Sequence, residues 1–218
     1  RAGAAGIEFL MSKGAASLLI ENNALLRPIG DQIAMAVFGD ANLSAQIRNN
    51  NFSINAIGSN VFLVVANKAR ADVVLERNLF HQPGDDGVTI NLLNDAQLRA
   101  SIRNNTFTAA GGDSIGIELR DSSKAAIQVA NNNLRDASLA SIYAETFDTS
   151  NLCMQILGNT VNRDMELFHN AGSVFNLEGT SPLAPFLMGT NTFQSGAVAN
   201  VGAGVTPVTF GFCGFPAP

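Results

Sequence analysis

The sequence predicts an all-β fold, a right-handed, single-stranded parallel β-helix of about seven to eight coils of ~27 residues. Two observations predict it. First, a short segment that alternates apolar and polar residues recurs along nearly the whole chain. Second, each copy carries an Asn at the same place, and successive Asn residues lie 27 or 28 positions apart except for a last interval of 32. These residues, called the ladder Asn below, are Asn23, Asn50, Asn78, Asn105, Asn132, Asn159 and Asn191.

The repeated segment has the pattern of a β-strand with one buried face. In its clearest copy, Leu98, Ala100 and Ile102 are apolar at every second position before Asn105 and Phe107. Alternation over five residues is the period of a strand, whereas a helix face needs spacings of three and four. Each copy therefore predicts a strand that ends near its ladder Asn.

Two further columns indicate that each coil holds more than one strand. A second alternating pair follows the ladder Asn by 12 and 14 positions, as Ile117 and Leu119 follow Asn105. An Asn or Asp also recurs every 27 residues after the second strand, and these residue types tolerate the left-handed backbone of a corner. This corner column contains Asp40, Asn67, Asn94, Asp121 and Asp148.

The coils can bury their apolar faces only by stacking like strand on like strand, in parallel and about 4.8 Å apart. Parallel crossovers are right-handed in nearly all folds, which gives the expected hand. The ladder Asn side chains can then pass hydrogen bonds from coil to coil. Charges alternate two positions before the first four ladder Asn residues, so neighbouring coils attract each other there. These charged residues are Glu21, Arg48, Glu76 and Arg103.

The two ends of the chain depart from the regular repeat. Residues 1–14 predict an incomplete first coil, and the long last interval indicates an insertion at 163–181. In the last copy, Ala184, Phe186 and Met188 alternate as in the other strands before Asn191. Neither end shows an amphipathic pattern that would predict a capping helix.

The composition indicates one extended domain and excludes some partners. The repeat leaves no room for a boundary, so we expect residues 1–218 to form a single β-helix domain. The net charge is −5 and no basic run is present, which argues against a nucleic-acid partner. No apolar run approaches the length of a membrane span.

The two cysteines are compatible either with one disulfide in an oxidising compartment or with two free thiols. Cys153 stands between Leu152 and Met154, which the alternation turns inward, so we expect its side chain to point outward. Cys213 lies in a C-terminal segment, 179–218, that contains no Asp, Glu, Lys or Arg. A bridge between them would fasten this segment to the outside of the rod.

The strand ends at residues 47–52 and 102–107 share the pattern I-x-N-N-x-F. With the coil repeat, this pattern resembles the pectin-lyase-like right-handed parallel β-helix superfamily, and most closely in style its repeat-rich bacterial cell-surface and secreted members. The resemblance implies an extracellular or cell-surface location. The superfamily includes polysaccharide lyases, glycoside hydrolases, phage tailspikes and non-catalytic adhesins, so the fold does not decide the function.

The best candidates for chemistry are Asp85, Asp86 and Asp113. The pair Asp85 and Asp86 resembles one motif of polygalacturonase-like hydrolases, in which one carboxyl protonates the leaving oxygen while another activates water. However, Asp86 and Asp113 each lie eight residues after a ladder Asn, as does Asp31, which is the behaviour of a turn residue. We therefore assign no catalytic residue and expect no cofactor. A calcium ion held by Asp85, Asp86 and Asp113 is the open alternative.

The sequence favours a non-catalytic extracellular structural protein. The open end of a β-helix must be capped or paired, and we expect a neighbouring copy to cover the uncharged segment 179–218 through Phe210, Phe212 and Phe215. Such an end-to-end contact does not close, so it would build a fibre; the chain would otherwise form part of a cell-surface rod. Two alternatives are a polysaccharide-active enzyme near the three Asp residues and a glycan-binding adhesin that uses residues 163–181.

Overall fold

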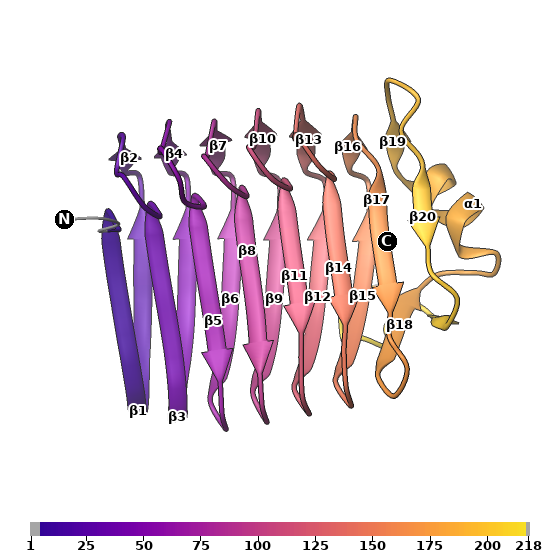
Figure 1. Ribbon diagram of the computed structural model, residues 1–218, viewed down its shortest axis with the longest axis horizontal. Helices are drawn as coiled ribbons and strands as arrows, with labels where there is room; N and C mark the ends of the chain where they lie inside the picture. Colours follow the sequence, from indigo (N-terminus) through magenta and orange to yellow (C-terminus); the bar gives the residue numbers. More distant parts are fainter. Residues whose placement is uncertain (1–4, 217–218) are drawn as a thin grey trace.

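The structure is a computed structural model that describes residues 5–216, and it forms one solenoid of stacked coils (Figure 1). Each regular coil has three faces. Two faces belong to a 14-stranded sheet and the third is a 7-stranded sheet, so the third face counts seven coils. In Figure 1, the near strands run down and the far strands run up while the chain advances to the right, which makes the winding right-handed.

Two long strands begin the solenoid and bend around a corner, so that each contributes to the first two faces. They are β1 (Ile7–Glu21) and β3 (Ile33–Arg48), paired in parallel. Beyond β3 the two faces have separate strands. The first face continues through β5 (Val61–Ala66), β8 (Val88–Leu93), β11 (Ile115–Leu119), β14 (Ile142–Thr146), β17 (Met165–His169) and β20 (Ala199–Val201).

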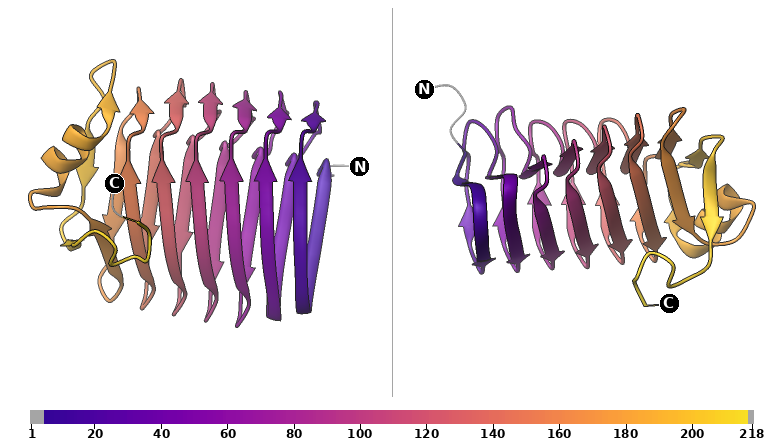
Figure 2. Two further views of the ribbon diagram at one scale, coloured as in Figure 1. Left: turned by 180° about the vertical axis from the view of Figure 1, so that it is seen from behind. Right: turned by 90° about the horizontal axis from the view of Figure 1, so that it is seen from below.

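The second face continues from β3 through β6 (Arg70–Glu76), β9 (Gln97–Arg103), β12 (Lys124–Ala130), β15 (Asn151–Leu157), β18 (Val174–Glu178) and β21 (Val205–Val208). The third face has short strands: β2 (Ala24–Leu25), β4 (Asn51–Phe52), β7 (Leu79–His81), β10 (Thr106–Thr108), β13 (Asn133–Arg135), β16 (Thr160–Val161) and β19 (Thr192–Phe193). Figure 2 shows the three faces from behind and from below. The predicted parallel stacking of like strand on like strand is confirmed.

The register of the strands follows the repeat of the sequence. Val73, Ala100 and Ile127 are paired positions on β6, β9 and β12, and all three side chains are buried. On the third face, the rings of Phe52, Phe80 and Phe107 stack with centroids 5.0 and 4.5 Å apart. The alternation read from the sequence therefore fills a single continuous core.

Sharp corners between faces use left-handed backbone. The residue before the ladder Asn has a φ between 54° and 58° in the first five coils, and Gly158 takes this place in the sixth with a φ of 66°. Asn is frequent there because its short polar side chain tolerates this region. The predicted corner column behaves likewise at four of its five positions: Asn67, Asn94, Asp121 and Asp148 have φ between 56° and 63°.

The C-terminal end differs from the sequence prediction in two ways. Residues 184–188 form no strand but part of helix α1 (Leu183–Thr190), and Leu183 and Leu187 are buried against the last coil. The expectation that neither end carries a capping helix is therefore wrong at this end. The helix closes the core there because it satisfies its own backbone hydrogen bonds and needs no further coil to pair with.

The predicted insertion at 163–181 is also wrong. This stretch holds two regular strands, β17 and β18, on two faces of one coil. The additional length before Asn191 is the segment that contains α1. Among residues 5–216, no helix is long and apolar enough to cross a membrane.

Candidate functional site

The three predicted carboxylates lie at the corner that leads into the first face. Asp86 and Asp113 occupy equivalent positions in adjacent coils, two residues before β8 and β11, and Asp31 holds the same place before β3. Asp85 is exposed beside Asp86. The structure thus brings Asp86 and Asp113 together in one column, as the sequence repeat predicts.

Each carboxylate in this column accepts a hydrogen bond from the backbone of the next coil. Asp31 Oδ1 accepts from the N–H of Ser59 at 2.8 Å, and Asp86 Oδ1 accepts from the N–H of Asp113 at 2.8 Å. Asp113 Oδ1 accepts from the N–H of Ala140 at 2.7 Å. One oxygen of every carboxylate is therefore committed to holding two coils together.

The second oxygens of Asp86 and Asp113 are directed over strand β11. A Cβ built at Gly116 would lie 2.8 Å from Asp86 Oδ2 and 3.7 Å from Asp113 Oδ2. A side chain at this point of the strand would crowd the carboxylate of Asp86, whereas Asp113 would stay at an ordinary contact distance. Asp86 Oδ2 also accepts a hydrogen bond from Thr89 Oγ1 at 2.8 Å.

The column is a poor environment for negative charge. Burial raises the pKa of Asp113 to about 6, and the nearby negative charge of Asp86 adds to the rise, whereas the hydrogen bond from Ala140 opposes it. Burial likewise raises the pKa of Asp86 and of Asp31 above the usual aspartate value. Proton uptake by these groups is thus shifted toward neutral pH.

Further acidic side chains line the outer surface of the same face. Glu118 forms an ion pair with Arg120 at 3.1 Å. Glu145 accepts a hydrogen bond from the hydroxyl of Tyr143, and the ring of Tyr143 lies edge-on to Phe168 with centroids 6.1 Å apart. Burial and the hydrogen bond to Glu145 raise the pKa of the Tyr143 hydroxyl.

The three carboxylates are not grouped as a set of metal ligands in this structure. Within residues 5–216, no three His, Cys, Asp or Glu side chains gather closely enough to hold a metal ion. Asp85, the third ligand of the calcium alternative, is exposed at the corner, and one oxygen each of Asp86 and Asp113 already accepts a backbone N–H. The arrangement fits a structural turn better than a calcium site.

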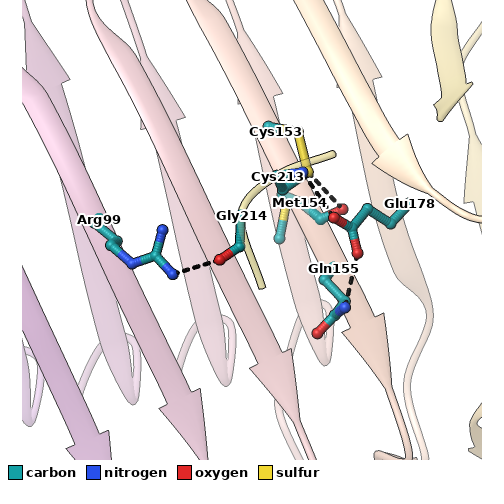
Figure 3. The surroundings of a disulfide bond; sticks show 7 residues. All are labelled: Arg99, Cys153, Met154, Gln155, Glu178, Cys213 and Gly214. Atoms are coloured by element: carbon teal, nitrogen blue, oxygen red, sulfur yellow. Dashed lines mark hydrogen bonds between the residues drawn. A yellow bond between two sulfur atoms is a disulfide. The ribbon is translucent and has the colours of Figure 1, made fainter. Parts of the chain in front are cut away.

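The C-terminal tail, residues 209–216, lies against the outside of the second face (Figure 3). Cys153 and Cys213 are joined by a disulfide across 60 residues of sequence. Both sulfurs belong to a small apolar cluster on the outer side of β15, separate from the core, together with Phe215. The disulfide therefore fastens the tail to the outside of the rod.

Polar groups on the second face hold the tail on either side of the disulfide (Figure 3). The buried carboxylate of Glu178 accepts the N–H of Cys213 at 2.7 Å and the side-chain amide of Gln155 at 2.7 Å. The guanidinium of Arg99 donates to the carbonyl of Gly214 at 2.7 Å and lies 4.5 Å from the centroid of the Phe215 ring. We call these contacts and the disulfide the tail latch.

Sequence reasoning did not find Arg99, Gln155 or Glu178, although they hold the tail. They occupy outward positions of the strands, where the repeat predicts only solvent contact. The one signal for this arrangement was Cys153, an outward cysteine among inward neighbours. No other feature of the sequence marks these three residues as partners of the tail.

The three Phe residues expected at an assembly interface have different environments. Phe215 is buried under the tail latch, and Phe210 is half-buried beside Phe186 of α1, with ring centroids 5.9 Å apart. Phe212 exposes 61% of its surface. The chain's own coils and helix thus cover much of the apolar surface that we expected a neighbouring copy to cover.

We compared the chain with protein-family models, curated proteins and solved structures, and none of them matches it.

Proposed function

We propose that this chain is a non-catalytic structural protein, the closed end segment of an extracellular or cell-surface rod. The observation that carries the proposal is the use of Asp31, Asp86 and Asp113, which each accept a backbone N–H of the next coil. A general acid or base must instead be free to reach a substrate. These aspartates, which include the strongest candidates for catalysis, instead connect neighbouring coils through hydrogen bonds.

The location is part of the proposal and has its own support. A disulfide persists in oxidising compartments such as the bacterial periplasm and the cell exterior, and the chain has one between Cys153 and Cys213. The coil pattern resembles the pectin-lyase-like superfamily, in particular its repeat-rich bacterial cell-surface members. We therefore propose an architectural relationship to those proteins.

The closed C-terminal end supports a rod rather than a fibre built head to tail from copies of this chain. Helix α1 covers the last coil with Leu183 and Leu187, and the tail latch holds the remaining residues on the side of the rod. A second copy that added its first coil there would have to displace the helix. If the rod associates end to end, the N-terminal end of the solenoid is thus the end that is free to do so.

A depolymerisation assay tests the non-catalytic role. The chain would be incubated with a panel of neutral and uronate-containing polysaccharides, and new reducing ends and unsaturated products would be measured at pH 5 to 8. We expect no turnover above that of a variant carrying Asp86→Asn and Asp113→Asn. Turnover that this matched variant lacks would overturn the proposal in favour of a polysaccharide-active enzyme.

A glycan-binding adhesin is the second candidate, and one observation favours it. Tyr143 and Phe168 present two partly exposed aromatic rings on the first face, flanked by Glu118, Glu145 and Glu166. Aromatic rings next to hydrogen-bonding groups suit sugar recognition. Binding on a glycan array that Tyr143→Ala abolishes, and that Phe62→Ala on the same face preserves, would support this role.

The adhesin hypothesis does not extend to residues 163–181 as a recognition loop. Most of that stretch forms β17 and β18, whose strands pair with neighbouring coils. Its deletion would remove a coil and not a surface loop. The Tyr143 substitution is therefore the better test.

A further inference from the structure

We infer that the N-terminal edge of the solenoid is an interaction surface for one more parallel coil of the same repeat. This edge consists of the outer side of β1 together with Asn23. The interaction rests on the proposed role of the chain as a rod segment. It specifies which end of the rod continues and what the adjoining coil must carry.

The backbone of β1 is paired on one side only. Strand β1 pairs with β3 over residues 7–21, and no other described strand lies beside it. In a parallel sheet, alternate residues direct their N–H and C=O groups to opposite sides. About half of the backbone groups of β1 therefore face outward from the end of the rod, which is the condition for adding a strand.

Inward side chains of the first coil are less covered than their partners in the next coils. Phe9 is only partly buried, whereas its partners Met35 and Leu63 in the next two coils expose 1% each. Leu18 is also partly buried, and its partner Ala45 exposes 1%. The repeat thus places apolar side chains at this edge, and the other coils of the chain cover them only partly.

The hydrogen-bond ladder has a direction, and this direction defines the missing neighbour. Each ladder Asn from Asn23 to Asn159 donates its backbone N–H and its Nδ2 group to Oδ1 of the ladder Asn in the following coil, as Asn23 does to Asn50 at 3.0 and 3.1 Å. The Oδ1 of Asn23 receives no donor from residues 5–216. A preceding coil with an Asn at the ladder position would supply both donors.

The charges at the edge fit the same neighbour. Glu21 accepts from Arg48 Nε at 2.7 Å, and two coils further Glu76 pairs with Arg103 at 3.4 Å. In this alternating column, Glu21 is the last charge at the open end. A basic residue two positions before the incoming Asn continues the alternation and places opposite charges side by side.

A second copy of this chain does not satisfy these requirements. At its C-terminal end, the donors of Asn191 are already used, since its N–H and its Nδ2 group both donate to the carbonyl of Leu187 in α1, each at 3.0 Å. Two N-terminal edges placed face to face would oppose one Asn23 Oδ1 to another, acceptor against acceptor. The occupant is therefore a coil whose ladder Asn donors are free.

The chain itself contains a suitable test coil. Ala5 is equivalent to Asp113 in the register, so a second copy of residues 86–112 inserted directly before Ala5 in place of residues 1–4 would keep the strands aligned. The inserted copy carries Arg103 and Asn105 at the positions that meet Glu21 and Asn23. Hydrogen exchange of β1 amides in the parent and extended chains gives the readout.

We expect the outward amides of β1 to exchange more than about tenfold more slowly in the extended chain, because a paired amide exchanges only on opening. A matched extension with Arg103→Glu and Asn105→Ala in the inserted copy should give less protection. Unchanged exchange in the extended chain would overturn the inference, as would equal protection by both extensions.

The oligomeric state of the parent chain provides the second arm. Light scattering at micromolar concentrations should show a monomer with unprotected β1 amides. A dimer whose β1 amides are already protected would overturn the assignment of the occupant in favour of a second copy. Because the depolymerisation assay addresses the proposed function separately, a failure of the added coil to dock and the discovery of an activity are distinguishable outcomes.

Discussion

At the scale of single residues, the ladder Asn side chains place one polar group per coil beside an apolar core. Asn132 Oδ1 accepts the backbone N–H and the Nδ2 group of Asn105 at 2.9 and 3.0 Å. Its own Nδ2 group donates to Ile102 O at 2.8 Å and to Asn159 Oδ1 at 3.0 Å. Four hydrogen bonds thus satisfy one buried amide and fix the register between three coils.

Replacing a ladder Asn should cost far more than replacing its neighbour in sequence. Asn132→Ala leaves buried donors and an acceptor without partners, and we expect a loss of about 2 to 4 kcal/mol in the free energy of unfolding. The control is Asn133→Ala, whose side chain only accepts from Arg135 at the surface; its effect should stay within about 0.5 kcal/mol. Urea unfolding followed by circular dichroism measures both. Equal losses would contradict the ladder interpretation.

The corner carboxylates should make stability depend on pH. The pKa of Asp113 in the folded chain is raised to about 6 by burial, whereas an unfolded aspartate titrates near 3.9. The folded chain then binds the proton more tightly, so this group contributes most below the unfolded pKa, and its contribution is lost as the pH rises through about 6.

Asp113→Asn keeps the acceptor for the Ala140 N–H but removes the charge. We expect the thermal midpoint of the wild-type chain to fall between pH 4 and pH 7, and the variant to show a smaller fall. Asp72→Asn, an exposed carboxylate on the second face, is the control and should follow the wild type. A variant profile that parallels the wild type would exclude Asp113 as the source of the pH dependence.

At the scale of elements, the strands were predictable because each is specified many times over by the repeat. Every coil repeats the alternation before its ladder Asn, and a strand can bury that face only against its neighbours. Helix α1 was missed because its sequence, LAPFLMGT, is apolar on all sides and contains Pro185 and Gly189. Its apolar residues at 184, 186 and 188 fit the strand pattern equally well. In the structure β18 supplies the second-face strand of this coil, and the segment between β18 and Asn191 folds as the helix.

The carboxylate corner could be found from the sequence, and the disulfide was one of two alternatives there, but the other contacts of the tail latch could not be found. Asp86 and Asp113 repeat in phase with the coils, so their proximity follows from the period alone. Arg99, Glu178 and Gly214 come from non-equivalent positions, and their meeting depends on the path of the tail across the second face. Such a path has no periodic signal.

The disulfide should make a measurable contribution to stability. Closing a loop of 60 residues restricts the unfolded chain, which is worth about 2 to 4 kcal/mol in typical proteins. We expect the double variant Cys153→Ser and Cys213→Ser to unfold at correspondingly lower urea concentration and to be cleaved faster near Phe212. The native oxidised chain should not react with a maleimide. Labelling of both thiols without a reductant would contradict the bridge.

At the scale of the whole molecule, the two ends of the rod are not equivalent. The C-terminal coil is covered by α1 and fastened by the tail latch, whereas the first coil meets a neighbour on one side only among residues 5–216. In a solenoid each coil contacts only the coils next to it, so the energy of an end coil depends on a single interface plus any cap. Local opening should therefore begin at the first coil.

Hydrogen exchange along the native chain tests this asymmetry. We expect the lowest protection from exchange in β1 and the highest in the central strands β8, β9, β11 and β12. Strands β17 and β18 should show intermediate protection, because the helix and the disulfide replace part of a missing neighbour. Reducing the disulfide should lower the protection of β18 and leave that of β3 unchanged, since interface energies act between nearest coils. Equal fraying at both ends would contradict a closed C-terminus, and a loss of protection that reached β3 would show that the coils unfold as one cooperative unit.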